Sequence, residues 1–308
     1  MSRPRITILE VRKNFFKSYL LVAIMIAVVF GLGYVIGYYM GNVHYGVILA
    51  AIACVVMIPI QLLTAKFAIL SMTKGKPLNL NDPRHRRLKS ITEGLTISAG
   101  MSRVPDIYVM PTSVPNAFAS GISEKNAFIG VTEGLLNMLD DRELTGVVAH
   151  EISHIVHRDI MLSQITVALV SVIMFLSMIA SRMAYFMRPR GRDRNSGGGI
   201  GLIILAMVIF SVLIRPLAMI IANLLMLAVS RKREYAADAY AVRLCGYNEG
   251  LASALAKLGG LKQLSSEQKA SLGGDTMKPM YIHYQELNSL FATHPPIDER
   301  VRRLLEMY

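Results

Sequence analysis

The chain has 308 residues, of which 53% are hydrophobic, and its mean hydropathy is +0.43. This composition is too apolar for an ordinary soluble protein. The formal net charge is +12, and the only cysteines are Cys54 and Cys245, a number that excludes a framework of several disulfides.

The first apolar block lies between Lys17 and Lys66 and contains no Asp, Glu, Lys or Arg. A helix rises about 1.5 Å per residue and needs about 20 apolar residues to cross a bilayer. The block therefore predicts two membrane spans, over 19–40 and 46–65, in an N-terminal hairpin formed by residues 1–70. The first span is longer than the apolar region of a cleaved signal peptide.

Basic residues flank this hairpin on both sides. They are Arg3, Arg5, Arg12, Lys13 and Lys17 before it, and Lys66, Lys74, Lys76, Arg84, Arg86, Arg87 and Lys89 after it. The positive-inside rule then predicts that the N-terminus and the region after the second span are cytoplasmic. Topology and attraction to anionic lipid explain the basic excess. With no nucleic-acid motif in the chain, we expect the bilayer, and no nucleic acid, as a partner.

Residues 71–159 predict the first part of a domain outside the membrane. Asp82-Pro83 has the signature of a helix start, and this helix is expected to reach about Met101. Three short β-like runs follow, at 105–109, 116–119 and 127–131, and we expect a small antiparallel sheet. A short helix over 133–139 precedes Asp141, which we expect to cap the next helix.

That next helix carries His150-Glu151-Ile152-Ser153-His154. Positions i and i+4 lie on one face of a helix, so both histidines can bind one tetrahedral zinc ion. Glu151 lies beside the first histidine and can act as a general base toward water. Residue frequencies give such a pattern by chance in roughly one chain in a hundred of this length, so its surroundings must decide.

Two further apolar stretches predict spans over 160–180 and 200–229, in a second hairpin formed by 160–230. Arg215-Pro216 interrupts the last span, so we expect Arg215 to face the protein interior or the span to kink. The loop 181–199 holds five arginines and one aspartate, against the positive-inside rule if both spans cross. The alternatives are a re-entrant hairpin and a buried hairpin in a soluble domain; we favour full crossing.

A catalytic zinc site needs a third protein ligand, and two residues compete for that position. His157 lies a further turn along the motif helix. Glu234 begins a predicted helix over 231–258, with Asp238 on the same face. By spacing alone, a solvated helix face explains the two carboxylates as well as a role in a metal site does. The returning hairpin favours Glu234, because it brings the second part of the domain, 231–308, back to the membrane surface that the first one left.

The order of these motifs resembles the HtpX family of membrane-bound zinc metalloproteases, which is related to the CAAX prenyl endopeptidases. The resemblance rests on the paired N-terminal spans, Pro115–Ala119, His150–His154, Glu234 with Asp238, and Thr293-His294-Pro295-Pro296. It implies an α-helical integral membrane protein with about four transmembrane helices. The protease domain would be mainly α, of the zincin (gluzincin) type, and would hold one Zn²⁺ per chain.

The resemblance also implies a role for each site residue. The zinc ligands would be His150, His154 and Glu234, with Glu151 as the general base and Asp238 orienting the ligand shell. An oxyanion donor would be His294, although a capping or core histidine fits its position equally well. The run Asn116, Ala117, Phe118, Ala119 would be an edge strand for an extended substrate, the alternative being an ordinary sheet strand. Arg300 is a candidate partner for an acid near the site.

We therefore expect a multi-pass protein of the cell membrane with its protease domain and both termini in the cytoplasm. By resemblance it would cut misfolded or damaged membrane proteins in quality control, and a homo-oligomer is compatible with this function. One alternative is a prenyl-protein processing peptidase, for which four spans are few. The other is a non-catalytic metal-binding scaffold, which Glu151 disfavours because a structural site needs no general base.

Overall fold

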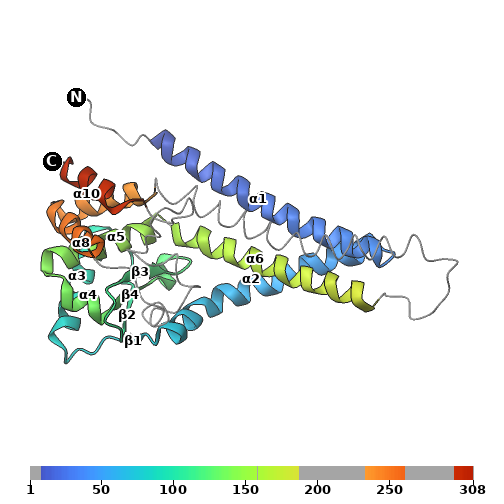
Figure 1. Ribbon diagram of the computed structural model, residues 1–308, viewed down its shortest axis with the longest axis horizontal. Coiled ribbons are helices and arrows are strands. Elements are labelled where there is room, and N and C mark those ends of the chain that lie inside the picture. The colour runs from blue at the N-terminus through green and yellow to red at the C-terminus, as the bar shows by residue number, and fades with distance from the viewer. Residues whose placement is uncertain (1–7, 158, 187–232, 261–294, 308) are drawn as a thin grey trace. The chain divides into compact units, whose positions relative to one another are not determined.

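Residues 8–157, 159–186, 233–260 and 295–307 are described by a computed structural model (Figure 1). The chain divides into two units, and each draws on two stretches of sequence. The first unit comprises Met1–Leu63 and Gln164–Met226. The second comprises Thr64–Ser163 and Leu227–Tyr308.

The first unit is built from long apolar helices: α1 (Ile8–Tyr39), most of α2 (Val43–Thr73) and most of α6 (Asp159–Phe186). Their buried side chains form one cluster, which includes Leu32, Ala50 and Val172. The first two helices approach closely at glycines, because a Cβ on Gly46 would lie only 2.0 Å from the carbonyl oxygen of Gly33. Small residues allow this kind of contact between apolar helices in membranes.

Two helices among the described residues are long and apolar enough to cross a membrane, Val43–Thr73 and Gln164–Arg182. A shorter apolar helix, Val22–Tyr38, lies within the first predicted span. The fourth predicted span, 200–229 with Arg215-Pro216, lies outside the described residues, as does most of the basic loop 181–199.

The second unit contains a four-stranded sheet in the order β1-β2-β4-β3. Its strands are β1 (Lys76–Pro77), β2 (Asp106–Met110), β3 (Ala117–Ser120) and β4 (Phe128–Thr132). The expected antiparallel sheet is wrong, because β2 and β4 pair in parallel, with Asp106 opposite Phe128. The hairpin of β3 and β4 places β4 inward, beside β2, and leaves β3 at the edge.

The helices of this unit are α3 (Pro83–Ser98), α4 (Glu133–Met138), α5 (Asp141–Val156), a helix over 233–245, α8 (Glu249–Gly259) and α10 (Ile297–Leu305). They follow the predicted order up to α5, whereas the helix predicted over 231–258 is interrupted at Gly246 and α10 was not predicted. The side chain of Asp82 caps α3, as expected. The expected cap of α5 is wrong by one residue, because Asp140 and not Asp141 accepts the backbone N–H of Glu143 at 2.9 Å.

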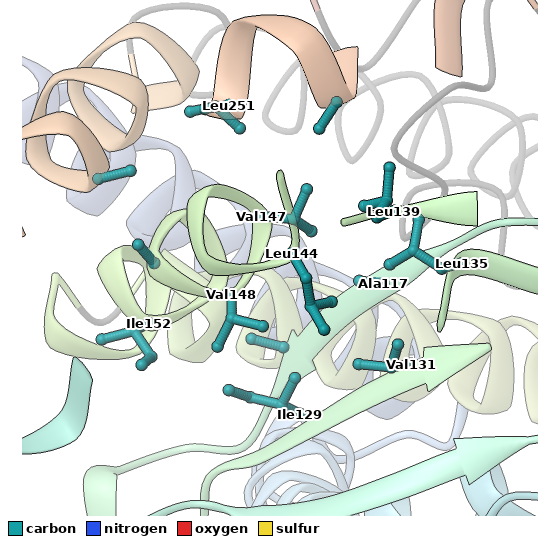
Figure 2. Close-up of a cluster of buried hydrophobic side chains, with 14 of the residues drawn as sticks. Ala117, Ile129, Val131, Leu135, Leu139, Leu144, Val147, Val148, Ile152 and Leu251 are labelled. Atoms are coloured by element: carbon teal, nitrogen blue, oxygen red, sulfur yellow. The ribbon is translucent and has the colours of Figure 1, made fainter. Parts of the chain in front are cut away.

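The core of the second unit surrounds α5. Figure 2 shows Leu144, Val147 and Val148 of α5 between the sheet residues Ile129 and Val131 on one side and Leu251 of α8 on the other. These side chains are buried, and they recur at helical spacing along α5. The core therefore fixes the rotation of the helix that carries His150 and His154.

Candidate metal centre

The helix α5 is fixed at its start by a capping box. The Asp140 side chain accepts the N–H of Glu143, and the Glu143 side chain accepts the N–H of Asp140 at 2.9 Å. Glu143 is also bound by Ser253 and Lys257 of α8. These contacts fix the register of α5 seven residues before His150.

A second helix supplies the acidic side chains. Glu234 and Asp238 lie four residues apart in the helix over 233–245, so they share one face. This helix ends before Gly246, whose φ of +78° is the left-handed conformation common at helix C-termini. Both carboxylates are buried, with exposed fractions of 5% and 1%.

Three potential ligand side chains converge between these two helices. The Nε2 atoms of His150 and His154 lie 3.3 Å apart. The Glu234 carboxylate oxygens lie 3.4 Å from Nε2 of His150 and 3.6 Å from Nε2 of His154. Among the described residues, these three side chains form the one group of histidine, cysteine and carboxylate ligands that could hold a metal ion.

The spacing of these atoms fits zinc. Tetrahedral bonds of 2.0–2.1 Å place any two ligand atoms about 3.3–3.4 Å apart. The observed separations lie close to this value: 3.3 Å between the two nitrogens, 3.4 Å from His150 to Oε2 of Glu234, and 3.6 Å from His154 to Oε1 of Glu234. Two imidazoles and one carboxylate are also a ligand set of catalytic zinc, which leaves the fourth position for water or substrate.

Asp238 supports the first of these histidines. Nδ1 of His150 lies 3.0 Å from Oδ1 of Asp238, so Nδ1–H donates there and the lone pair of Nε2 is left for a metal. Burial alone would lower the pKa of His150, but hydrogen bonding to Asp238 and Glu234 raises it to about 9. The carboxylates thus favour positive charge at this point, which is what a metal cation would supply.

Arg300 of α10 completes the buried cluster. Its Nε and Nη2 donate to the two Asp238 oxygens at 2.9 and 2.7 Å, and its Nη1 lies 3.4 Å from Oε2 of Glu234. Burial would raise the pKa of Asp238, but the Arg300 charge and hydrogen bonds from His150 and Arg300 lower it. The sequence indicated that Arg300 could pair with an acid near the site, and the structure identifies this acid as Asp238.

The remaining candidate residues are Glu151, His157 and His294. Glu151 is buried, with an exposed fraction of 5%. Burial would lower the pKa of Arg300, but Asp238 and Glu234 raise it, and the charge of Glu151 adds a smaller contribution in the same direction. His157 is not in the ligand group; it ends α5, and its Nδ1 lies 2.8 Å from the carbonyl oxygen of Ser153. His294 lies outside the described residues.

The predicted substrate strand corresponds to β3. Ala117, Phe118 and Ala119 belong to it, and Asn116 directly precedes it, with its N–H donating to Oγ1 of Thr132 at 2.8 Å. The strand stands last in the sheet order and contacts α5. Beyond its end, a pocket of about 10 Å³ adjoins His154. Its other lining residues are Gly121, Ile122, Ser123, Ala127, Ile155 and Ile160.

The model of the Peptidase family M48 matches residues 82–308, which include all the residues of this cluster. The chain belongs to peptidase family M48. It is a membrane-bound metalloprotease, as the resemblance predicted, and the M48 family implies a metal cofactor, typically zinc.

Several curated M48 relatives bear the name Protease HtpX homolog. The protein of Syntrophotalea carbinolica is 37% identical, over 78% of this chain and 81% of its own. That of Dictyoglomus thermophilum is 42% identical, over 71% and 69%. That of Streptococcus gordonii is 33% identical, over 94% and 95%.

A solved structure shares the fold. The crystal structure of S. mikatae Ste24p matches with a TM-score of 0.51 and 24% identity, over 96% of this chain. The match covers 66% of the Ste24p chain, so about a third of that protein has no counterpart here.

Proposed function

We propose that this chain is a zinc endopeptidase in which His150, His154 and Glu234 hold the metal and Glu151 is the general base. The observation that carries the proposal is the convergence of these side chains: the two Nε2 atoms lie 3.3 Å apart, and each has a Glu234 oxygen at 3.4 or 3.6 Å, near the spacing of a tetrahedral zinc shell. Bound zinc would polarise the scissile carbonyl and make water a stronger acid.

The protein residues divide the remaining work. Glu151 takes a proton from the attacking water and passes it to the leaving amine, which requires a carboxylate beside the ligands. Its neighbour His150 is a proposed ligand, Glu151 is buried, and its charge acts on Arg300 of the cluster. Asp238 holds the His150 ring with Nε2 toward the metal. His294 is proposed as the oxyanion donor by the resemblance.

An extended segment of a protein is the proposed substrate. Strand β3 stands at the edge of the sheet, where a peptide can add by main-chain hydrogen bonds. The pocket beside His154 has room for about one water molecule, so it would accept only a small side chain. Such binding favours chains that have lost their fold, because a folded protein does not present an extended segment.

The membrane helices and the flanking charges support a location. We propose that the protease unit, built from residues 71–159 and 231–308, works at the cytoplasmic face of the cell membrane in a multi-pass protein. The basic residues between Lys66 and Lys89 favour that side. Misfolded or damaged membrane proteins are the proposed physiological substrates, as the HtpX resemblance implies.

The test is the Glu151→Gln variant of the full chain in detergent, loaded with zinc. We expect cleavage of an unfolded protein substrate to fall by about 10²–10⁴-fold, the usual contribution of a general base, with zinc still bound. Glu249→Gln, at an exposed position on α8, is the matched control and should cleave normally.

Three outcomes would contradict the proposal. Undiminished cleavage by Glu151→Gln would exclude this residue as the base. Zinc binding without cleavage of unfolded proteins by the wild-type chain would favour the scaffold alternative. Cleavage restricted to prenylated peptides would instead favour the prenyl-protein processing peptidase.

A further inference from the structure

The guanidinium group of Arg300 is buried against the carboxylates of Asp238 and Glu234, and the charge of Glu151 also acts on it. The exposed fraction of Arg300 is 1%, and those of Glu151, Glu234 and Asp238 are 5%, 5% and 1%. Burying a charge is costly unless it is paired and hydrogen-bonded. The charges of a divalent metal and one arginine together neutralise three carboxylates, whereas the metal alone would leave a net charge of −1.

The contacts of Arg300 are directed at the support of the site. It binds both Asp238 oxygens in a bidentate pair, and Oδ1 of Asp238, which accepts from Nη2, lies 3.0 Å from Nδ1 of His150. Nη2 also lies 3.4 and 3.5 Å from the two ring nitrogens of His150. A bidentate arginine fixes both the position and the plane of a carboxylate.

We propose that Arg300 is a positioning residue that sets the affinity for zinc by holding Asp238 against His150. The inference rests on the proposed zinc site. Arg300 does not need to touch the substrate or the metal for this role. It fixes the carboxylate, the carboxylate fixes the imidazole, and the imidazole then presents Nε2.

Arg300 is not the principal anchor of its helix. Ile297 and Leu304 of α10 are buried in the core, and the side chain of Asn248 donates to the carbonyl oxygen of Leu304 at 2.8 Å. Ile297 also packs on Gly259 of α8. A variant of Arg300 can therefore keep α10 in place, which separates its role in the site from one in folding.

The test measures zinc affinity by competition with a chelator, on the full chain in detergent. We expect Arg300→Met to weaken zinc binding by about 10- to 100-fold, the usual effect of losing a group that supports a ligand. Arg302→Met is the matched control: it lies on the same helix, its side chain is 60% exposed, and it should bind zinc as the wild type does.

A double-mutant cycle tests the route through Asp238. Asp238→Asn with Arg300→Met should bind zinc no more weakly than Asp238→Asn alone. Losses that multiply would overturn the proposal, as would wild-type affinity in Arg300→Met. Should that variant fail to fold, Arg300→Lys replaces it. A lysine keeps the positive charge but cannot form the bidentate pair with Asp238, so wild-type zinc affinity in Arg300→Lys would also overturn the proposal.

The failure of this inference can be told apart from that of the proposed function. A wild-type chain that binds no zinc would remove the proposed function itself. A wild-type chain that binds zinc, with Arg300 variants that bind it equally well, would remove only the role of Arg300.

Discussion

The imidazole of His150 is held at both of its nitrogens. Asp238 lies at Nδ1, while Glu234 and His154 lie within 3.4 Å of Nε2. The ring therefore has one orientation in which a metal ligand and a hydrogen-bond donor are both satisfied. Glu234 closes the group from the second helix, and its carboxylate is the proposed third ligand, a position that the sequence spacing left open.

Replacing Glu234 by glutamine tests that ligand. The amide keeps the size of the side chain but lacks the negative charge, so zinc affinity should fall by about 100-fold or more. His157→Ala should bind zinc as the wild type does, because His157 instead contacts Ser153 and Tyr240. Zinc content after dialysis measures both variants. Full zinc in Glu234→Gln, with a loss in His157→Ala, would reverse the assignment.

Residue patterns anticipated the ligand group better than its support. His150 and His154 follow from helical spacing, and Glu234 followed from the return of the chain through a predicted hairpin. Arg300 was named as a partner for an acid, but its partner depends on how α10 packs against the helix over 233–245. No sequence period encodes that contact. The structure brings the candidate ligands together, but their binding of zinc and the roles of Asp238, Glu151 and His294 stay predictions.

At the scale of elements, α5 is joined to α8 through a buried carboxylate. Oε1 of Glu143 accepts from Ser253 at 2.6 Å, and Oε2 accepts from Lys257 at 2.7 Å and from the N–H of Asp140. Burial would raise the pKa of Glu143, but the hydrogen bonds from Lys257, Ser253 and Asp140 lower it. Asp140, the other acid nearby, acts in the opposite direction through its charge.

This lowered pKa predicts a pH dependence of stability. The contribution of Glu143 is fully present above its ordinary pKa of 4.5 and is lost as the pH falls through the lower folded-state value. Glu143→Gln should therefore cost about 2 kcal/mol at pH 7, where charged hydrogen bonds are lost, and progressively less below pH 4.5. Thermal unfolding followed by circular dichroism over pH 3–7, a range set around that pKa, measures the difference.

The control for this prediction is Glu93→Gln. Glu93 pairs with Lys89 at 3.7 Å on an exposed face of α3, so its loss should change stability by less than about 1 kcal/mol at any pH. A constant gap between Glu143→Gln and the wild type from pH 7 to pH 3 would contradict the linkage argument.

Element positions were more predictable than element pairing. The three predicted β-like runs each lie one residue before the observed strands, because alternation and turn residues locate strands. The alternation of apolar and polar residues within a strand does not determine which strands pair, so the sequence did not predict the parallel pair of β2 and β4. The cap of α5 carried a readable signal: a glutamate three residues on, Glu143, selects Asp140 over Asp141.

At the scale of the whole molecule, the chain interleaves its two units. Thr64–Ser163 and Leu227–Tyr308 form the unit with the candidate site, and Gln164–Met226 between them belongs to the other unit. The ligands of the site therefore come from both sides of an apolar insertion. We propose that this insertion is the second membrane hairpin, with both ends on the cytoplasmic side.

Labelling of single cysteines in intact cells tests this orientation. In a background without Cys54 and Cys245, Met40→Cys would lie at the end of α1, where the native side chain is 51% exposed. Arg103→Cys would lie in the protease unit, where the native side chain is 58% exposed. The positive-inside rule places the first position outside and the second in the cytoplasm, because basic residues flank the N-terminal hairpin on both sides.

A membrane-impermeant maleimide should therefore label Met40→Cys in intact cells, and Arg103→Cys only after the cells are permeabilised. Because both positions are exposed in the native protein, their labelling in permeabilised cells controls for access to the thiol. Labelling of Arg103→Cys in intact cells would place the protease unit outside. That result would contradict cutting at the cytoplasmic face while leaving the zinc chemistry of His150, His154 and Glu234 untouched, because the ligand geometry does not depend on which side the unit faces.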